Sequence, residues 1–225
     1  MIRKATNEEI DFFENRLYFL QDELLKQLEK EKFYLTGGTC LSRFYLGHRY
    51  SEYLDFFFDG NKFTPLDFEQ DFISFVTKIK NCGEIEVTVN EKTFKRMFVK
   101  KEEKVLKIEF VFEPYPRIGD LVKKRNFLID TEENIAVNKL TAIYSRKTAK
   151  DFYDLYFLLK RYDLNDLIKK VEIKMVPPDY EGLLVSLKES LLEGELLAKL
   201  PITESMFIGF IEDLIKKLLD YAKQF

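Results

Sequence analysis

The sequence predicts an α+β fold, in which a mixed or antiparallel β-sheet with flanking helices is followed by a C-terminal helical domain. Short apolar runs separated by turn residues fill the first half of the chain, whereas from Glu133 onward the pattern is helical almost throughout. The chain has 225 residues, of which 46% are apolar, so it can bury a substantial core. We therefore divide it into an α/β domain over 1–120 and a helical domain over 121–225 that closes a cleft.

The first expected element is an amphipathic helix over about 7–30. Thr6 and Glu9 have the spacing of a capping box at its start. Apolar residues follow at helical intervals: Ile10, Phe13, Leu17, Leu20, Leu24 and Leu28. Alternating strands and helices are expected next, over 33–36, 39–46, 53–58 and from Thr64-Pro65 onward.

Three strands and then a run of helices complete the expected order. The strands cover about 84–90, 93–100 and 104–112, and their connections are short enough for antiparallel hairpins. The helical half has expected breaks near 145–148, 163, 177–178 and 201.

Composition and charge exclude several kinds of protein. Two cysteines, Cys40 and Cys82, make neither a disulfide framework nor a metal knuckle, and a single histidine, His48, argues against a zinc site or a histidine-based triad. The net charge of −3 gives no overall field that attracts nucleic acid. No apolar run approaches the ~20 residues that span a bilayer, and the first residues lack the apolar core of a signal peptide, so we expect a cytoplasmic protein.

The segment from Leu35 to Phe58 carries the strongest functional signal. An apolar strand enters Gly37-Gly38-Thr39 and a short helix, and the following strand carries Asp55. Backbone amides after paired glycines at a helix start bind phosphate, and a carboxylate on a neighbouring strand can hold the accompanying metal. Asp55 read alone is a solvated residue at a strand end. Beside the two glycines, it favours a metal or phosphate site.

Strand alternation places Asp55 on the face that also carries Tyr53. The apolar neighbours point to the other face: Leu54, Phe56 and Phe58. In the strand over 104–112, Glu109 likewise shares its face with Lys107 and not with the apolar residues. Glu109 has two readings, a metal ligand or a solvent-facing acid paired with a neighbouring lysine.

The second functional segment lies in the helical half, over 138–159. Lys139 and Arg146 are two helical turns apart, so they can share a face and neutralise a triphosphate. Asp151 and Asp154 are one turn apart and can orient either cation. An alternative reading makes Thr148 the cap of a helix whose third position, Asp151, favours an acid.

The two segments resemble the signatures of the AbiEii-type nucleotidyltransferases, a branch of the polymerase-β-like superfamily. The matching residues of the first segment are Gly37, Gly38, Thr39, Leu41, Arg49, Ser51 and Asp55, and those of the second are Lys139, Arg146, Lys150, Asp151, Asp154 and Leu155. The resemblance implies a nucleotidyltransferase-like fold, an NTP substrate with Mg²⁺ as cofactor, transfer to an RNA (tRNA) or protein acceptor, and a toxin role with an antitoxin partner.

The resemblance also implies roles for these side chains. Asp55 and Glu109 are the expected metal ligands and, with Lys139 and Asp151, the expected catalytic residues. The expected nucleotide-binding residues are Gly37, Gly38, Thr39, Arg49, Ser51, Lys139 and Arg146.

Tyr53 stands where the family has the first of two carboxylates. A neutral phenol is a poor Mg²⁺ ligand. Glu52 points to the opposite face, and Asp59 is about 13 Å along the strand from Asp55. An alternative function is therefore a catalytically degenerate nucleotide-binding or protein-interaction module. The retained basic side chains of the second segment favour an enzyme.

A basic run, Lys123-Lys124-Arg125, lies at the junction of the two halves. Such a run can contact the phosphate backbone of RNA. The alternative is a solvated linker, and the sequence leaves both readings open.

Overall fold

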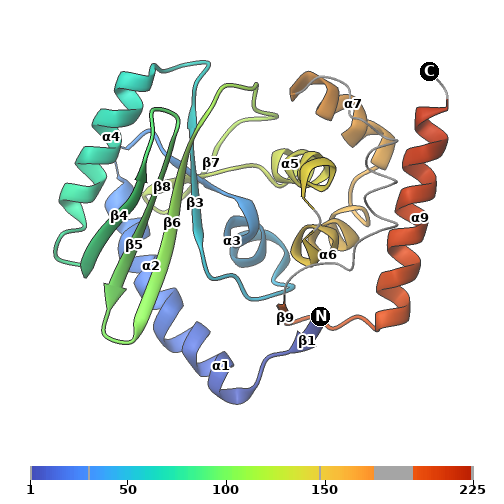
Figure 1. Ribbon diagram of the computed structural model, residues 1–225, viewed down its shortest axis with the longest axis horizontal. Coiled ribbons are helices and arrows are strands. Elements are labelled where there is room, and N and C mark those ends of the chain that lie inside the picture. The colour runs from blue at the N-terminus through green and yellow to red at the C-terminus, as the bar shows by residue number, and fades with distance from the viewer. Residues whose placement is uncertain (1, 30, 147, 175–194, 224–225) are drawn as a thin grey trace. The chain divides into compact units, whose positions relative to one another are not determined.

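The computed structural model describes residues 2–29, 31–146, 148–174 and 195–223 (Figure 1). The chain divides into two compact units. The sheet unit comprises Ala5–Tyr45 and Ser51–Thr131, and the helical unit comprises Met1–Lys4, Leu46–Tyr50 and Glu132–Phe225. Both units are discontinuous in sequence, because the short stretch Leu46–Tyr50 belongs to the helical unit.

The sheet unit is built on a seven-stranded sheet with the strand order β4-β5-β6-β3-β2-β8-β7. Its strands are β2 (Tyr34–Thr36), β3 (Leu54–Asp59), β4 (Glu84–Asn90), β5 (Phe94–Lys101), β6 (Lys104–Glu113), β7 (Val122–Lys124) and β8 (Phe127–Ile129). The pairs β3–β6 and β2–β8 are parallel and the others antiparallel, so the sheet is mixed. The predicted fold class and the two hairpins joining β4, β5 and β6 are confirmed.

Helices of the sheet unit begin where the sequence provides caps. The expected first helix is one helical stretch with a π-turn inside it, made of α1 (Asn7–Phe12), η1 (Phe13–Leu17), α2 (Tyr18–Leu25) and η2 (Lys26–Leu28). The capping box of Thr6 and Glu9 is formed. A second capping box, Thr64 with Asp67, precedes α4 (Pro65–Lys78) and has Pro65 in the first turn. After β2 come α3 (Gly37–Leu41) and η3 (Ser42–Leu46).

Phenylalanine rings fill the core between one face of the sheet and α4. Phe110 of β6 lies at the centre of this cluster, with its ring centroid 4.9 Å from that of Phe33 and 5.2 Å from that of Phe72. The strand residues on this face, Leu54, Phe56 and Phe58 among them, are fully buried, as their alternation predicts. The many phenylalanines of the sequence are therefore largely accounted for by packing.

The helical unit contains α5 (Glu132–Ser145), α6 (Ala149–Leu158), α7 (Leu164–Lys174) and α9 (Glu204–Ala222). The expected breaks near 145–148, 163 and 201 are confirmed, whereas the break at 177–178 lies outside the described residues. Two short strands of this unit escaped prediction, as did β7 and β8 of the sheet unit. In the helical unit, β1 (Ile2–Lys4) pairs in parallel with β9 (Leu196–Ala198), and Arg49 bridges to Ala198. In the described parts of the chain, no helix is long and apolar enough to cross a membrane.

We expect Phe110→Ala to lower the free energy of unfolding by about 3–5 kcal/mol, because it removes a fully buried ring and leaves a cavity. Phe98→Ala, whose half-buried ring lies on the other face of β5, should cost about 1 kcal/mol. Urea unfolding followed by circular dichroism measures both, and equal losses would contradict the assignment of the core to the α4 face.

Candidate functional site

The Gly37 turn joins β2 to α3 and touches the carboxylate of Asp55. Gly37 has φ +67°, in the left-handed region, and a Cβ at this position would lie 2.6 Å from Asp55 Oδ2. Both the backbone conformation and the close approach of the carboxylate therefore require glycine. The predicted phosphate turn and the predicted acid are thus neighbours within the sheet unit.

Thr39 and Ser51 fix the segment that leads into β3. The Thr39 hydroxyl is buried, lies 2.8 Å from Ser51 Oγ and donates a hydrogen bond to the carbonyl of Tyr53. Gln21 Nε2 donates to the carbonyl of Ser51 at 3.3 Å. These contacts give both hydroxyls a structural role, while their role in nucleotide binding remains a prediction.

A row of polar side chains crosses the sheet on the face away from the phenylalanine core. Asp55 of β3 is the register partner of Glu109 in β6 and of Thr36 in β2. Glu109 is in turn opposite Arg96 of β5. Because register partners point to the same side of a sheet, the row reads Arg96, Glu109, Asp55, Thr36. Asp55 and Glu109 therefore share a face on adjacent strands.

Glu109 is held by two cations. Arg96 Nε and Lys107 Nζ lie 2.8 Å and 3.2 Å from the same oxygen, Oε1. The reading of Glu109 as an acid paired with a neighbouring lysine thus holds, and it leaves the predicted metal-binding role untested. The Lys107 ammonium also lies 4.0 Å from the centre of the Tyr53 ring.

Tyr53 is neutral at physiological pH in this setting. Burial, followed by the charge of Glu52, raises the pKa of its phenol above the ordinary value. The position where the family has a carboxylate is therefore occupied by an uncharged ring, 38% exposed, beside an ammonium.

Asp130 extends the row beyond β2 and was missed from the sequence. It is fully buried, and its Oδ2 accepts a hydrogen bond of 2.7 Å from Thr36 Oγ1. Its Oδ1 accepts from the amide of Thr131 at 3.0 Å. The sequence does show an acid directly after the apolar run 127–129 and at the start of a helix. A helix-capping role explains an acid at that position equally well, so the pattern does not single out Asp130 as a site residue.

The donor set of the row suits Mg²⁺ that arrives with a nucleotide. In the described residues, no group of three or more His, Cys, Asp or Glu side chains is placed to hold a metal ion. Mg²⁺ in phosphate-transfer sites is commonly bound through one or two carboxylates together with substrate phosphates. Asp55 and Glu109 supply two carboxylates of this kind.

In the helical unit, Lys139 of α5 lies between two acids of α6, Asp151 and Asp154. Its Nζ is 2.6 Å from Asp151 Oδ1 and 2.7 Å from Asp154 Oδ2. Burial opposes the charge of Lys139, but the two carboxylates outweigh it and raise its pKa. Burial likewise opposes the charge of Asp151, but Lys139 and Arg146 outweigh it and lower the pKa of Asp151 to about 2. All these groups are therefore ionised at neutral pH, and the predicted orienting role of the two acids matches their contacts.

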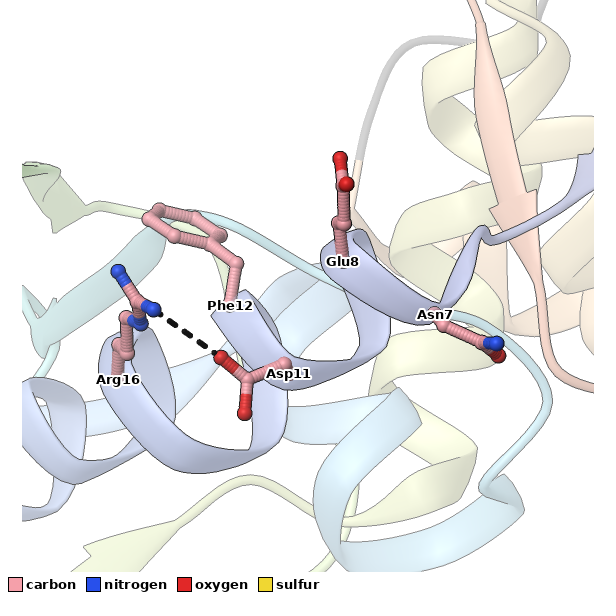
Figure 2. A pocket seen from close by; sticks show the side chains of 5 residues that line it. All are labelled: Asn7, Glu8, Asp11, Phe12 and Arg16. Atoms are coloured by element: carbon pink, nitrogen blue, oxygen red, sulfur yellow. Dashed lines mark ion pairs between the residues drawn. The ribbon is translucent and has the colours of Figure 1, made fainter.

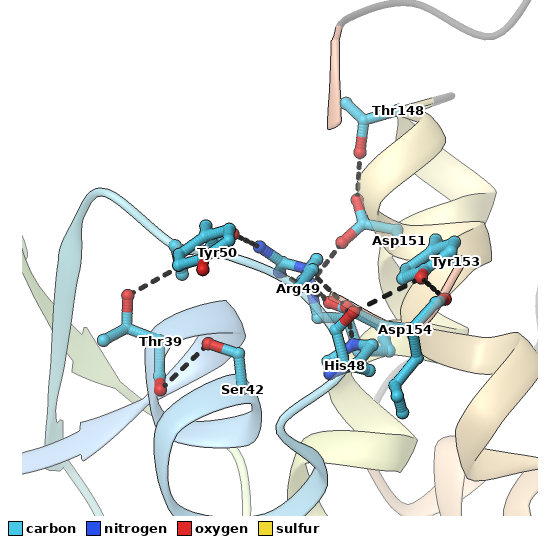
Figure 3. A network of polar contacts seen from close by, with 12 residues as sticks. Thr39, Ser42, His48, Arg49, Tyr50, Thr148, Asp151, Tyr153 and Asp154 are labelled. Carbon is cyan, nitrogen blue, oxygen red and sulfur yellow. Dashed lines mark hydrogen bonds and ion pairs between the residues drawn. The ribbon is translucent and has the colours of Figure 1, made fainter. Parts of the chain in front are cut away.

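Asp154 also binds the stretch Leu46–Tyr50 (Figure 3). The Arg49 guanidinium donates to both of its oxygens, at 2.6 Å and 2.9 Å. His48 Nε2 lies 2.7 Å from Oδ1, and burial lowers the pKa of His48, so the ring is a neutral donor. Arg49 is 3% exposed. Its side chain is therefore committed to Asp154, and a direct contact with nucleotide remains a prediction.

Arg146 is the exposed cation of this cluster. Its side chain is 59% exposed, and its Nε donates to Asp151 Oδ2 at 2.8 Å. The alternative reading holds in position, because Thr148 is the N-cap residue of α6 and Asp151 lies in its first turn. The Thr148 hydroxyl makes no capping bond to a backbone amide, however, and donates to the Asp151 carboxylate at 2.6 Å. Asp151 thus has both predicted roles. It is the acid in the first turn of α6, and it binds the two cations Lys139 and Arg146.

A separate hollow of about 500 Å³ lies along α1 (Figure 2). It is lined by Asn7, Glu8, Asp11, Phe12 and Arg16. Arg16 and Asp11, on the same helical stretch, form an ion pair of 3.3 Å beside it. None of the predicted site residues lines this hollow, so we assign it no role.

Comparison with known proteins fits this site. The mixed sheet with its flanking helices is similar to the fold of nucleotidyltransferase toxins. Residues 18–201 match the family described as nucleotidyl transferase AbiEii toxin, type IV toxin–antitoxin system, and the chain belongs to this family of toxin nucleotidyltransferases. The resemblance seen in the two sequence segments is thereby confirmed.

Individual relatives extend the likeness over most of the chain. An uncharacterised protein of Aquifex aeolicus, aq_aa25, is 31% identical over 159 residues, which cover 69% of this chain and 72% of that protein. JHP933 from Helicobacter pylori has a TM-score of 0.59 at 22% identity, covering 98% of this chain and 97% of its own. The nucleotidyltransferase toxin MenT4 from Mycobacterium tuberculosis has a TM-score of 0.61 at 18% identity, covering 91% and 83%. These structures share the fold.

We expect Asp154→Ala to lower the free energy of unfolding by about 3–5 kcal/mol, because it leaves buried Arg49 and Lys139 without a shared partner. Asp166→Ala removes an exposed acid that lies 3.7 Å from Lys169, and it should cost less than about 1 kcal/mol. Chemical unfolding of both variants provides the measurement. A loss for Asp154→Ala no larger than that of its control would contradict the central place of this carboxylate.

Proposed function

We propose that the protein is a Mg²⁺-dependent nucleotidyltransferase that moves a nucleoside monophosphate from an NTP to an RNA or protein acceptor. The observation that carries the proposal is the Asp55 carboxylate, set against the Gly37 turn and in register with Glu109. Membership of the AbiEii family supports it. From the family description we further propose a toxin role and a cognate antitoxin. A cytoplasmic location, expected from the sequence, is part of the same proposal.

In this proposal the glycine turn binds the phosphates. Gly37 and Gly38 leave the backbone open to close approach, and the amides of Gly38 and Thr39 are the proposed donors. Asp55 and Glu109 would hold Mg²⁺, which neutralises charge on the phosphates and aligns the attacking and leaving oxygens. The bonds from Arg96 and Lys107 orient the Glu109 carboxylate.

The helical unit supplies the proposed cations. Arg146 is exposed and oriented by Asp151, so it suits contact with a triphosphate. Lys139 is buried between two carboxylates and acts with Asp151 as the second part of the catalytic set. Arg49 and Ser51 have partners of their own, Asp154 and Thr39, so we propose that they position the site residues.

A second candidate function is a nucleotide-binding or interaction module without catalysis. Tyr53 favours it, because the phenol removes a carboxylate from the row and packs under Lys107. Arg146 favours the enzyme, since a site without chemistry has little need of an exposed cation that is oriented by a buried acid, Asp151.

Transfer of labelled nucleotide to a mixed pool of RNA and protein tests the proposed function. With each NTP and Mg²⁺, the native chain should label an acceptor, and Asp55→Asn should reduce labelling by about 100-fold, because metal clamping supplies several kcal/mol of the barrier. Glu86→Gln removes an exposed carboxylate from the same sheet and should leave labelling unchanged. Full activity in Asp55→Asn would refute the site, and NTP binding by the native chain without any transfer would favour the second candidate.

We expect Tyr53→Asp to raise the rate of transfer by about tenfold or more, because a restored carboxylate returns a ligand to the metal and each 1.36 kcal/mol is worth about tenfold. Tyr53→Phe keeps the ring under Lys107 and should leave the rate near the native value. The same labelling assay compares the three forms. A native chain at full activity with no gain in Tyr53→Asp would show that another group completes the site.

A further inference from the structure

The hairpin of β7 and β8 carries three cations near its turn, with Lys123 and Lys124 on opposite faces of the sheet. Lys123 and Lys124 end β7, and Arg125 forms the turn with Asn126. The side-chain amide of Asn126 donates a hydrogen bond of 2.7 Å to the carbonyl of Lys26, which brings a fourth cation beside the hairpin. We call the group of Lys26, Lys123, Lys124 and Arg125 the basic tip.

The charges of the basic tip are not compensated within the described part of the chain. Many other surface lysines of the sheet unit are paired, such as Lys32 with Asp67, Lys100 with Glu86 and Lys101 with Glu23. Lys80 and Lys92 form no ion pair among the described residues either, but they lie apart in sequence and not in one hairpin. None of the four cations of the basic tip forms an ion pair with a carboxylate among the described residues. The chain as a whole carries a charge of −3, so this local excess of positive charge runs against the composition.

The tip is also a fixed structure. Phe127, the register partner of Lys124, is 5% exposed, and its ring packs edge-on against Phe44 with centroids 5.8 Å apart. Arg125 has φ +53°, a left-handed conformation that is costly for a residue other than glycine or asparagine. Glu102 has the same conformation, φ +55°, in the turn between β5 and β6, so the tight hairpin turn accounts for it.

Protection of the sheet edge explains only part of this cluster. β7 is an edge strand, and lysines on an edge discourage pairing with another chain. That role does not account for Arg125 in the turn or for Lys26 at the end of the helical stretch. At the opposite edge, β4 has a bulge between Val87 and Val89.

We propose that the basic tip binds the sugar–phosphate backbone of a nucleic acid. Four exposed or half-buried cations at a fixed tip suit a chain of regularly spaced phosphates, and the release of counterions drives such binding. A protein acceptor offers no comparable row of charge. The binding of nucleic acid by the basic tip does not depend on the proposed function. The further step, that this nucleic acid is the acceptor of the nucleotide, rests on the proposed function.

The test is binding of fluorescent single-stranded RNA to the full chain, without NTP or metal, over a range of salt concentrations. The double variant Lys123→Gln/Arg125→Gln should flatten the slope of log affinity against log salt by about 1.4, or about 0.7 for each lost phosphate contact. The control is Lys80→Gln/Lys92→Gln, which removes two exposed cations from the same unit and should keep the native slope. Circular dichroism establishes that both variants are folded.

Several outcomes decide the proposal. Native affinity and slope in the tip variant, or an equal loss in the control, would overturn it. Competition by poly-glutamate as strong as that by RNA would also overturn it, because any polyanion would then suffice. Competition by free NTP but not by longer RNA would assign the tip to a triphosphate and overturn the backbone assignment.

DNA of the same sequence shows whether the protein distinguishes ribose from deoxyribose, and binding of either polymer through the tip supports the proposal. Because no transfer is measured, failure here leaves the labelling assay of Asp55→Asn to judge the enzyme.

Discussion

The helical unit depends on the ionised carboxylate of Asp154. This group is wholly buried and binds the neighbouring residues His48 and Arg49 as well as Lys139, which lies about 90 residues further along the chain. Burying an ionised carboxylate away from water costs several kcal/mol of folding free energy unless cations and hydrogen-bond donors compensate it. The contacts therefore fix the stretch Leu46–Tyr50, α5 and α6 together, and they hold Lys139 in place for its second bond, to Asp151. Stability and the placement of a candidate catalytic pair come from one cluster.

The sheet unit depends instead on the two-residue period of its strands. On one face, rings such as Phe56 and Phe110 pack against α4 and exclude water. On the other face, the same strands carry Asp55 and Glu109 side by side. The aromatic core makes a slip of register costly, because one residue of slip would move every ring out of the core. The packing of phenylalanines thus keeps the two carboxylates aligned.

The helices and strands that could be predicted from the sequence are those long enough to show a regular apolar period. The helical stretch from Asn7, the strands β3 to β6 and the helices α4, α5 and α6 follow from spacing and caps. The three-residue strands β1, β7, β8 and β9 are too short for a period to appear, and the pairing of β1 with β9 joins opposite ends of the chain. At the site, Asp55 and Glu109 follow from strand phase. Asp130 and the bond between Arg49 and Asp154 do not, because tertiary contacts more than 90 residues apart create them.

Tyr53 affects the net charge of the polar row as well as removing a metal ligand from it. Asp55 and Glu109 carry two negative charges, and Arg96 and Lys107 carry two positive charges beside them. These four side chains are together neutral, so any excess negative charge of the row rests on the buried Asp130, and an acid in place of the uncharged Tyr53 would add one negative charge. A row with so little excess negative charge attracts a divalent cation weakly. Under the proposed function, most of the attraction for Mg²⁺ then comes from the triphosphate, so metal and nucleotide bind as one ligand and neither is held firmly alone.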